Sequence, residues 1–339
     1  MTQTAGHRTV VLGVGSIGER HLRCFQSTGR TELAIVEPNP TLRQTVAERY
    51  GISQAFASLA EAWEFRPTAA VVATPAPFHI PLSTELAERK VHLLIEKPLS
   101  TSLEGIDRLQ QVVGENNVTV ALAYVLRMYP VLQGLKSALE SGRFGRPVQL
   151  VAVGGQNFPT YRPAYRDIYY RDRALGGGAI QDALTHTLNA GEWLVGPIDR
   201  LLADAAHQVL DGVEVEDTVH ILTRQGNVMG SYSLNQHQPA NESTLTVICE
   251  RGMVRGEFHL NRWRWTERPE EPWHDEPVAV AERDTHFIAQ ADAFLDAVEG
   301  RRSVACTLQE GLQTLRVNLA ALASLDATVW QPVAENAIR

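Results

Sequence analysis

Short apolar runs alternate with helix-like segments over the first third of the chain. The runs are residues 9–12, 32–36, 69–73, 91–95 and 118–121, and helix-like patterns occupy 19–27, 40–50, 79–89 and 102–113. This alternation is typical of βαβ units on a parallel sheet. It predicts an α/β fold with a doubly wound parallel sheet that closes near residue 123. Ser102 is the candidate N-cap of the last helix in this series.

The pattern changes beyond residue 123. Helices are predicted at 130–141, 180–194, 285–299 and 308–325, and strands at 148–153 and repeatedly from 200 to about 265. Turn signals such as Gln225-Gly226-Asn227 separate these strands, without βαβ alternation. We therefore predict a second α/β domain, residues 124–339, built on a large open and mostly antiparallel sheet. The acidic segment 267–276 is expected to be an exposed loop.

Composition narrows the class of protein. The 339 residues are 44% hydrophobic and 21% charged, which is usual for a globular protein and long enough for two domains. A net charge of −8 argues against nucleic acid or an anionic membrane as the partner. No apolar run is long enough to span a bilayer, and no signal peptide is visible. Three cysteines without CxxC spacing suit a reducing cytoplasm, where we expect the protein.

A glycine motif directly follows the first predicted strand. Gly13, Gly15 and Gly18 form Gly-x-Gly-x-x-Gly, with Ser16 and Ile17 between the last two. The first glycine would make a tight bend, the second would let the backbone approach a pyrophosphate, and the third would let the helix pack on the strand. Free N–H groups at the helix N-terminus would hold the phosphates. The motif predicts a dinucleotide site formed by these five residues.

The second predicted strand ends at Glu37. A carboxylate in this place can accept hydrogen bonds from the ribose hydroxyls of NAD, and it would repel the 2′-phosphate of NADP. The sequence therefore favours NAD over NADP as the cofactor. Arg43 is near enough in sequence to meet a 2′-phosphate, and Glu37 has the simpler alternative of a solvated carboxylate at a strand end.

Two further segments follow predicted strands at the same edge. They are Thr74-Pro75 and Glu96-Lys97-Pro98. In open α/β sheets ligands bind beyond the carboxyl ends of the strands. Lys97, directly after a buried strand, would be partly desolvated, which lowers a lysine pKa toward the range useful for proton transfer. The alternative is a surface lysine stabilised by Glu96.

Asp182 and His186 follow the triple glycine 176–178. A helix beginning near residue 180 puts positions i and i+4 on one face. The imidazole could take a hydroxyl proton, and Asp182 could orient it or hold a substrate hydroxyl. No cysteine or HExxH pattern completes a metal site here, so we expect no metal. A core histidine is the alternative for His186.

Together these residues resemble the Gfo/Idh/MocA family of NAD(P)-dependent sugar and polyol oxidoreductases. The matching positions are 13–18, Thr74-Pro75 with His79, Glu96-Lys97-Pro98, Tyr124 with Arg127 and Pro130, and 176–178 with Asp182 and His186. The resemblance implies an NAD-binding Rossmann domain in 1–123. It implies a substrate-binding and oligomerisation domain in 124–339, whose open sheet packs against another subunit in a homodimer or homotetramer. The last helices of the chain would pack back on the N-terminal domain.

The resemblance also implies the chemistry. Lys97, Asp182 and His186 look like the catalytic residues, with Lys97 and His186 as acid/base and the principal base between them open. The implied reaction is reversible oxidation of a secondary hydroxyl on a sugar, sugar acid or cyclitol, with hydride transfer to nicotinamide. Expected cofactor residues, besides the glycine turn and Glu37, are Thr74, Pro75, His79, Glu96 and Lys97. Expected substrate residues are Tyr124, Arg127, Arg162, Arg166, Asp182 and His186.

The chain departs from the family pattern at two positions. Ala76 stands where asparagine often follows Thr-Pro, and Asn189 stands where an acidic residue is frequent. The 161–173 loop resembles a subgroup associated with nucleotide-sugar or acidic-sugar chemistry. Its arginines, Arg162, Arg166 and Arg171, could meet a carboxylate or phosphate of the substrate. Solvent or a subunit contact is the alternative for them.

Two other functions stay open. A redox-neutral NAD-dependent epimerase, lyase or glycosidase would pass through a transient keto intermediate and would not accumulate NADH. A non-catalytic NAD-binding regulator would bind the nucleotide without turnover, although the retention of Lys97, Asp182 and His186 argues against it. The substrate's identity and the physiological direction are not readable from the sequence.

Overall fold

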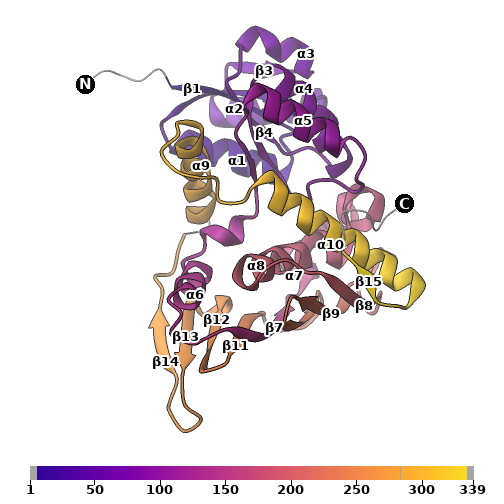
Figure 1. Ribbon diagram of the computed structural model, residues 1–339. Helices are drawn as coiled ribbons and strands as arrows, with labels where there is room; N and C mark the ends of the chain where they lie inside the picture. The colour runs from indigo at the N-terminus through magenta and orange to yellow at the C-terminus, as the bar shows by residue number, and fades with distance from the viewer. Residues whose placement is uncertain (1–5, 283, 334–339) are drawn as a thin grey trace. The chain divides into compact units, whose positions relative to one another are not determined.

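The computed structural model describes residues 6–282 and 284–333 (Figure 1). The chain divides into two compact units. The first runs to residue 128 and includes 281–309, and the second comprises 129–280 and the residues from 310 on. Helix α9 (Thr285–Val298), one of the last two helices, therefore belongs to the N-terminal unit.

The N-terminal unit is built on a six-stranded sheet with the order β3-β2-β1-β4-β5-β6, in which every neighbouring pair is parallel. The strands are β1 (His7–Leu12), β2 (Thr31–Val36), β3 (Gln54–Phe56), β4 (Ala69–Val72), β5 (His92–Ile95) and β6 (Val120–Leu122). The strand order changes direction at β1 and β4, as in dinucleotide-binding folds. The predicted doubly wound sheet is confirmed.

Helices connect these strands. They are α1 (Ser16–Ser27), α2 (Pro40–Tyr50), the short α3 (Leu59–Ala62) with the 3₁₀ turn η1 (Trp63–Phe65), α4 (His79–Glu88) and α5 (Ile106–Asn116). The prediction that Ser102 caps the last of them is wrong. Helix α5 begins at Ile106 after Gly105, whose φ is +75°. The Ser102 hydroxyl instead accepts a hydrogen bond from the Glu104 N–H at 3.3 Å, because a separate turn precedes the helix.

The second unit carries a nine-stranded sheet with the order β14-β13-β12-β11-β7-β10-β9-β8-β15. The strands are β7 (Pro147–Gly155), β8 (Arg200–Ala206), β9 (Thr218–Gln225), β10 (Val228–Asn235), β11 (Glu242–Cys249), β12 (Gly252–Glu257), β13 (Arg262–Thr266), β14 (His274–Pro277) and β15 (Gln331–Pro332). All pairs are antiparallel except β7 with β10, so the predicted mostly antiparallel sheet is confirmed.

The prediction of an exposed loop over 267–276 is wrong for residues 274–276, which belong to strand β14. His274 pairs with Trp265 across β13 and β14, and the two rings stack with centroids 3.9 Å apart. The acidic composition concealed this strand because both of its faces are exposed. The α-helices of this unit are α6 (Pro130–Glu140), the short α7 (Phe158–Tyr161), α8 (Thr185–Val195) and all but the first two residues of α10 (Leu308–Ala327).

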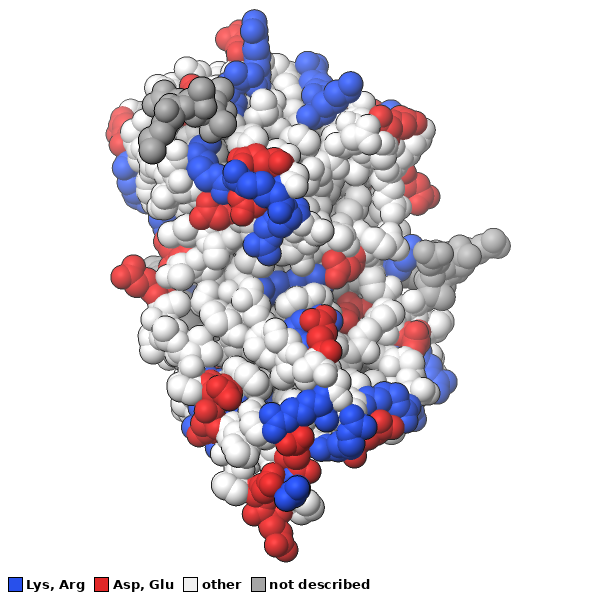
Figure 2. Space-filling model, turned by 60° about the vertical axis from the view of Figure 1, so that its left-hand side comes forward, with Lys and Arg blue, Asp and Glu red and all other residues white. Residues whose placement is uncertain are grey.

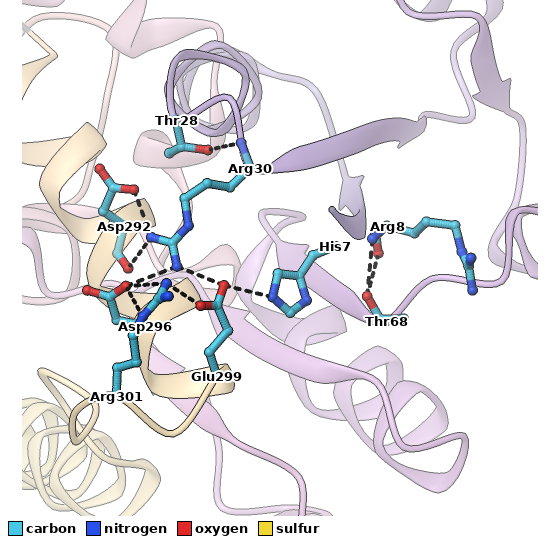
Figure 3. A network of polar contacts seen from close by, with 9 residues as sticks. All are labelled: His7, Arg8, Thr28, Arg30, Thr68, Asp292, Asp296, Glu299 and Arg301. Carbon is cyan, nitrogen blue, oxygen red and sulfur yellow. Dashed lines mark hydrogen bonds and ion pairs between the residues drawn. The ribbon is translucent and has the colours of Figure 1, made fainter. Parts of the chain in front are cut away.

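An ion-pair network holds α9 within the N-terminal unit (Figure 3). Arg30, just before β2, donates to Asp292 at 3.0 Å, to Asp296 at 2.9 Å and to Glu299 at 2.8 Å. His7 at the start of β1 reaches Glu299 at 3.1 Å. Helix α9 also packs beside α1 (Figure 1), with the rings of Phe25 and Phe294 6.2 Å apart. These contacts explain why residues so late in the chain belong to the first unit.

Replacing Arg30 by methionine keeps an unbranched apolar stem but removes the shared cation. We expect the melting temperature to fall by about 2–4 °C near neutral pH, the shift that about 1 kcal/mol produces in a domain of this size. Differential scanning calorimetry measures it. Arg302→Met is the control, because Arg302 is exposed and forms no ion pair within the described part of the chain.

The effect of Arg30→Met should depend on pH. Burial raises the pKa of Asp296 and Glu299, but hydrogen bonds from neighbouring cations outweigh it and hold both pKa values below their usual range. A carboxyl with a lowered pKa stabilises the fold above its unfolded pKa, and the contribution is lost as pH falls through the folded value. The difference between wild type and variant should therefore shrink below about pH 4. A constant difference down to that pH would contradict the assignment.

Candidate active site

The glycine turn lies between β1 and α1. Gly13 has φ +79°, and a Cβ there would stand 2.9 Å from the Ala73 carbonyl oxygen. A Cβ on Gly18 would lie 1.8 Å from the Gly13 carbonyl oxygen, so the helix can approach the strand only with glycine here. Apart from its two chain neighbours, no described residue has an atom within 4 Å of the Cβ position on Gly15, at the N-cap of α1. The turn thus has the bend, the close packing and the open backbone that a dinucleotide cradle needs.

Glu37 lies beside this turn. Its Oε2 accepts from the Val14 N–H at 3.2 Å, and its Oε1 accepts from the Asn39 N–H at 3.0 Å. The carboxylate therefore ties the end of β2 to the glycine turn after β1. Arg43 turns to the backbone instead, since its Nη1 donates to the Glu37 carbonyl at 2.5 Å.

His79 joins the loops after β4 and β5. The ring is buried, with Nε2 2.7 Å from the Thr74 carbonyl and Nδ1 3.0 Å from the Pro98 carbonyl. Burial lowers its pKa more than these carbonyls raise it, so the neutral ring donates to one carbonyl at a time. The Lys97–Pro98 peptide is cis. The strand-end loops carrying Thr74 and Lys97 are thus fixed to each other by one side chain.

A buried polar pair lies beneath Lys97. The Nε2 of His21, on α1, is 2.7 Å from Glu96 Oε1, and Glu96 Oε2 accepts from the Lys97 N–H at 2.9 Å. His21 has no solvent exposure and Glu96 has 4%. Burial raises the pKa of Glu96, but the His21 hydrogen bond and the nearby charge of Lys97 hold it below its usual range. A charged carboxylate therefore links helix α1 to the backbone at Lys97.

In the second unit, Asp182 and His186 lie on consecutive helical segments. Residues Ile180–Leu184 form a π-helical turn, and α8 begins at Thr185. The predicted helix is confirmed, but it starts with a wider turn, which is common at functional sites. Asp182 is 1% exposed, whereas His186 is half-buried.

Asp182 is surrounded by donors from the preceding loop. Tyr169 donates its hydroxyl to Asp182 Oδ1 at 2.6 Å, and Arg162 Nη1 lies 3.2 Å from Oδ2. The charge of Asp182 raises the pKa of Arg162. A buried carboxylate is stable in its charged form only when it is paired and hydrogen-bonded in this way.

Glu216 organises the start of the same helical segment. Its carboxylate accepts from Arg173 Nε at 2.8 Å and from the Ile180 N–H at 3.1 Å, near the helix N-terminus. A Cβ on Gly178 (φ +86°) would stand 2.4 Å from Glu216 Oε1, and one on Gly177 would stand 2.2 Å from the Tyr170 carbonyl. These two glycines are needed for close packing of the loop and the helix.

Three other predicted substrate residues bond to backbone carbonyls or are buried within their own unit. Tyr124 and Arg127 are buried in the first unit, where Arg127 donates to the Ala305 carbonyl at 2.9 Å. Arg166 donates to the Asp211 carbonyl at 2.8 Å. Asn189 donates to Thr314 at 2.9 Å, so this departure from the family pattern serves the packing of α8 on α10.

Reasoning from the sequence missed His21, Glu216 and Tyr169. His21 lies three residues past Gly18, which was a usable signal, because that spacing puts it on the first turns of α1. Glu216 and Tyr169 gave none, since their partners are distant in sequence. Among the described residues, no group of three or more His, Cys, Asp or Glu side chains is placed to hold a metal ion. No described helix is long and apolar enough to cross a membrane.

Known proteins resemble this chain over nearly its full length. It is 25% identical over 334 residues to the UDP-N-acetylglucosamine 3-dehydrogenase of Acidithiobacillus ferrooxidans, covering 93% of this chain and 95% of the relative. It is 26% identical over 270 residues to the inositol 2-dehydrogenase of Corynebacterium glutamicum, covering 76% of each. The fold matches the WlbA dehydrogenase of Bordetella pertussis, a complex with NADH and UDP-GlcNAcA. The TM-score is 0.82 at 25% identity, covering 98% of this chain and 100% of that one.

Family models match both units. The model of the oxidoreductase family with an NAD-binding Rossmann fold matches residues 7–124, and the GFO/IDH/MocA C-terminal domain matches residues 132–255. The glycine turn, the strand order and the nine-stranded sheet agree with these matches. The chain therefore belongs to the Gfo/Idh/MocA oxidoreductase family, with the NAD-binding Rossmann domain in its N-terminal unit.

Proposed function

We propose that this protein is an NAD-dependent dehydrogenase that oxidises a secondary hydroxyl of a sugar, sugar acid or cyclitol. The observation that supports this best is the carboxyl edge of the six-stranded sheet. There the glycine turn, Glu37 and Lys97 follow β1, β2 and β5, so a nucleotide cradle and a proton-transfer group share one edge. The names of the two relatives describe dehydrogenases of a sugar nucleotide and of a cyclitol, which supports a sugar or cyclitol as the substrate class of this protein.

The residues fit NAD. Gly13, Gly15 and Gly18 provide the cradle, with Ser16 and Ile17 opening helix α1 under the pyrophosphate. Glu37 faces the end of the turn, where a ribose hydroxyl would donate to it. Thr74 and Pro75 line the next strand end, while the buried His79 and Glu96 hold the loops from behind. When bound, NAD supplies the acceptor for the hydride.

The chain's own residues handle the proton. As the C–H hydride leaves the carbinol carbon, the hydroxyl proton passes to a base and the C=O bond forms. Lys97 and His186 are the groups proposed for this transfer. Asp182 accepts hydrogen bonds from Arg162 and Tyr169, which hold it in place to orient a substrate hydroxyl or His186.

The proposal predicts NADH formation that depends on Lys97. With NAD and a panel of sugars, sugar acids and cyclitols, we expect absorbance at the NADH band for at least one substrate class. Lys97→Met should lower kcat by at least about 100-fold, the usual contribution of a general base, with NAD affinity nearly unchanged. Near-normal turnover in this variant would remove Lys97 from the mechanism.

Two outcomes favour other functions. Altered sugar detected by mass spectrometry without NADH accumulation would indicate the redox-neutral epimerase, lyase or glycosidase. Tight NAD binding without any turnover would indicate a regulator. Arg302→Met serves as the control for a lost surface cation.

The position of Glu37 predicts cofactor preference. Replacing Glu37 by serine removes the charge that would repel a 2′-phosphate, so the ratio of NADP to NAD affinity should rise by about tenfold or more. Fluorescence titration with both reduced nucleotides measures the ratio. An unchanged ratio would show that Glu37 supports the turn through Val14 without selecting the nucleotide.

We also propose a cytoplasmic homodimer or homotetramer. None of the three buried cysteines forms a disulfide, and burial raises the pKa of Cys24 and Cys249 to about 11. On the face in Figure 2, acidic and basic side chains are interspersed among uncharged ones, so this face offers no basic surface for a polyanion.

The nine-stranded sheet exposes Leu222 and Met229 on one face, at 50% and 53%. Exposed apolar side chains on a sheet favour a subunit contact there.

The proposed subunit contact through the sheet can be tested by placing negative charges on its exposed face. Leu222→Glu combined with Met229→Glu should convert the oligomer to monomers, because association would bury two carboxylates in each subunit. Light scattering after gel filtration measures the mass. Val280→Glu, at an 81% exposed position outside the sheet, is the matched control. An oligomer that survives the double substitution would place the interface elsewhere.

A further inference from the structure

A cavity of about 470 Å³ lies in the N-terminal unit at the amino ends of its strands. Its walls include Arg8, Trp63, Arg66, Arg89, Lys90 and His92. Arg8 lies near the start of β1, and the other residues precede or begin β4 and β5. The glycine turn follows the opposite, carboxyl end of β1. The cavity is therefore separated from the nucleotide cradle by the length of a strand.

The charged side chains that line the cavity are all basic. No Asp or Glu lines it. Within the described residues, Arg8, Arg66, Arg89 and Lys90 form no ion pair, whereas other cations of the same unit do, such as Arg108 with Glu88 at 2.7 Å. Like charges that line one cavity repel one another, and this basic cavity occurs in a chain of net charge −8. An anion would relieve the repulsion.

The backbone places two of these cations at strained positions. Arg66 follows η1 with φ +54°, and Lys90 follows α4 with φ +60°. The helix α4 ends in a hydrogen-bonded cap, with Val91 N–H donating to the Leu86 carbonyl at 3.1 Å. Glycine is the usual residue at such a left-handed position, because the Cβ of another residue is crowded by the backbone there.

Two other helices of this unit end with residues that tolerate the left-handed conformation. Helix α2 ends at Gly51 (φ +65°) and α5 at Asn117 (φ +52°), a glycine and an asparagine, which tolerate this conformation. A cation anywhere in the last turn could complement the helix dipole, so the dipole does not require the strained position. Two long cations in left-handed conformations at one cavity are the kind of strain found at ligand sites.

Three of the lining side chains, Arg8, Arg89 and His92, are also held in place. Arg8 Nε donates to the Arg66 carbonyl at 2.7 Å, and the Arg89 guanidinium lies over the Trp63 ring, 4.1 Å from its centroid. His92 Nδ1 accepts from the Thr119 N–H at 3.0 Å, so the proton of its neutral ring is on Nε2. Donors fixed in this way lose little side-chain entropy when they bind.

We propose that this cavity is a binding site for a phosphate-bearing small molecule, of about the size of a sugar phosphate. Arg66, Arg89 and Lys90 supply the charged donors that phosphoryl oxygens prefer, and the volume lies within the range of small-molecule sites. The site is separate from the proposed dehydrogenase chemistry and does not depend on it.

The left-handed positions allow a test in which the variant is expected to fold. In Arg66→Gly combined with Lys90→Gly, glycine fits the backbone better, so the melting temperature should stay the same or rise. We expect the affinity for fructose 1,6-bisphosphate to fall by at least about tenfold, as expected when charged donors are lost. Isothermal titration calorimetry at saturating NADH measures it, with the nucleotide site filled.

Controls separate this site from others. Arg302→Gly combined with Arg301→Gly removes the same charge elsewhere in the unit and should leave the affinity unchanged. Inorganic pyrophosphate should compete with fructose 1,6-bisphosphate, and fructose should not. No binding of the bisphosphate at 0.15 M salt, an affinity unchanged in the double variant, or an equal loss in the control would each overturn the proposal.

Discussion

The structure of the candidate site depends on the hydrogen bonds that fasten successive strand ends to one another. Parallel strands bring their carboxyl ends to one edge, but the loops there have no sheet partners of their own. Glu37 secures the glycine turn to the end of β2, and His79 secures the loop after β4 to the loop after β5. The buried pair of His21 and Glu96 then fixes Lys97 relative to helix α1. Because His21, His79 and Glu96 are buried, each would leave an unsatisfied polar atom if its partner were removed, which opposes separation of the loops.

In the second unit, burial has a different consequence. Asp182 is almost fully buried, and its two oxygens are occupied by Tyr169 and Arg162. The cost of burying this carboxylate is offset by a cation and a hydroxyl donor from the preceding loop. Glu216 performs the corresponding structural task at the helix start, where the glycines at 177 and 178 allow the loop to pack closely. The arginines of the 161–173 loop are thus partly committed to the protein's own carboxylates.

Periodicity and turn chemistry predicted most elements within a residue or two. The helix at 40–50 matches α2, which has Asn39 as its N-cap, Pro40 in its first turn and Gly51 at its end, and the strand at 32–36 lies within β2, whose last four residues are buried. Reasoning from the sequence failed where local signals were contradicted by distant partners. Ser102 is a good cap residue, yet a turn through Gly105 delays the helix. The strand β14 has acidic, exposed residues, and it forms only because β13 offers an edge.

The sequence by itself determined the two α/β units, the glycine turn and the family, since these depend on residue types at short, fixed spacings. It also singled out Lys97, Asp182 and His186 as residues able to transfer or orient a proton. Only the tertiary structure decided that His21 meets Glu96 and that Arg173 meets Glu216. It also decided that four cations, which form no ion pair with any described residue, line one cavity at the amino edge of the Rossmann sheet. Those pairings join residues from separate elements, and their free energy depends on distance and burial, neither of which is encoded by any local pattern.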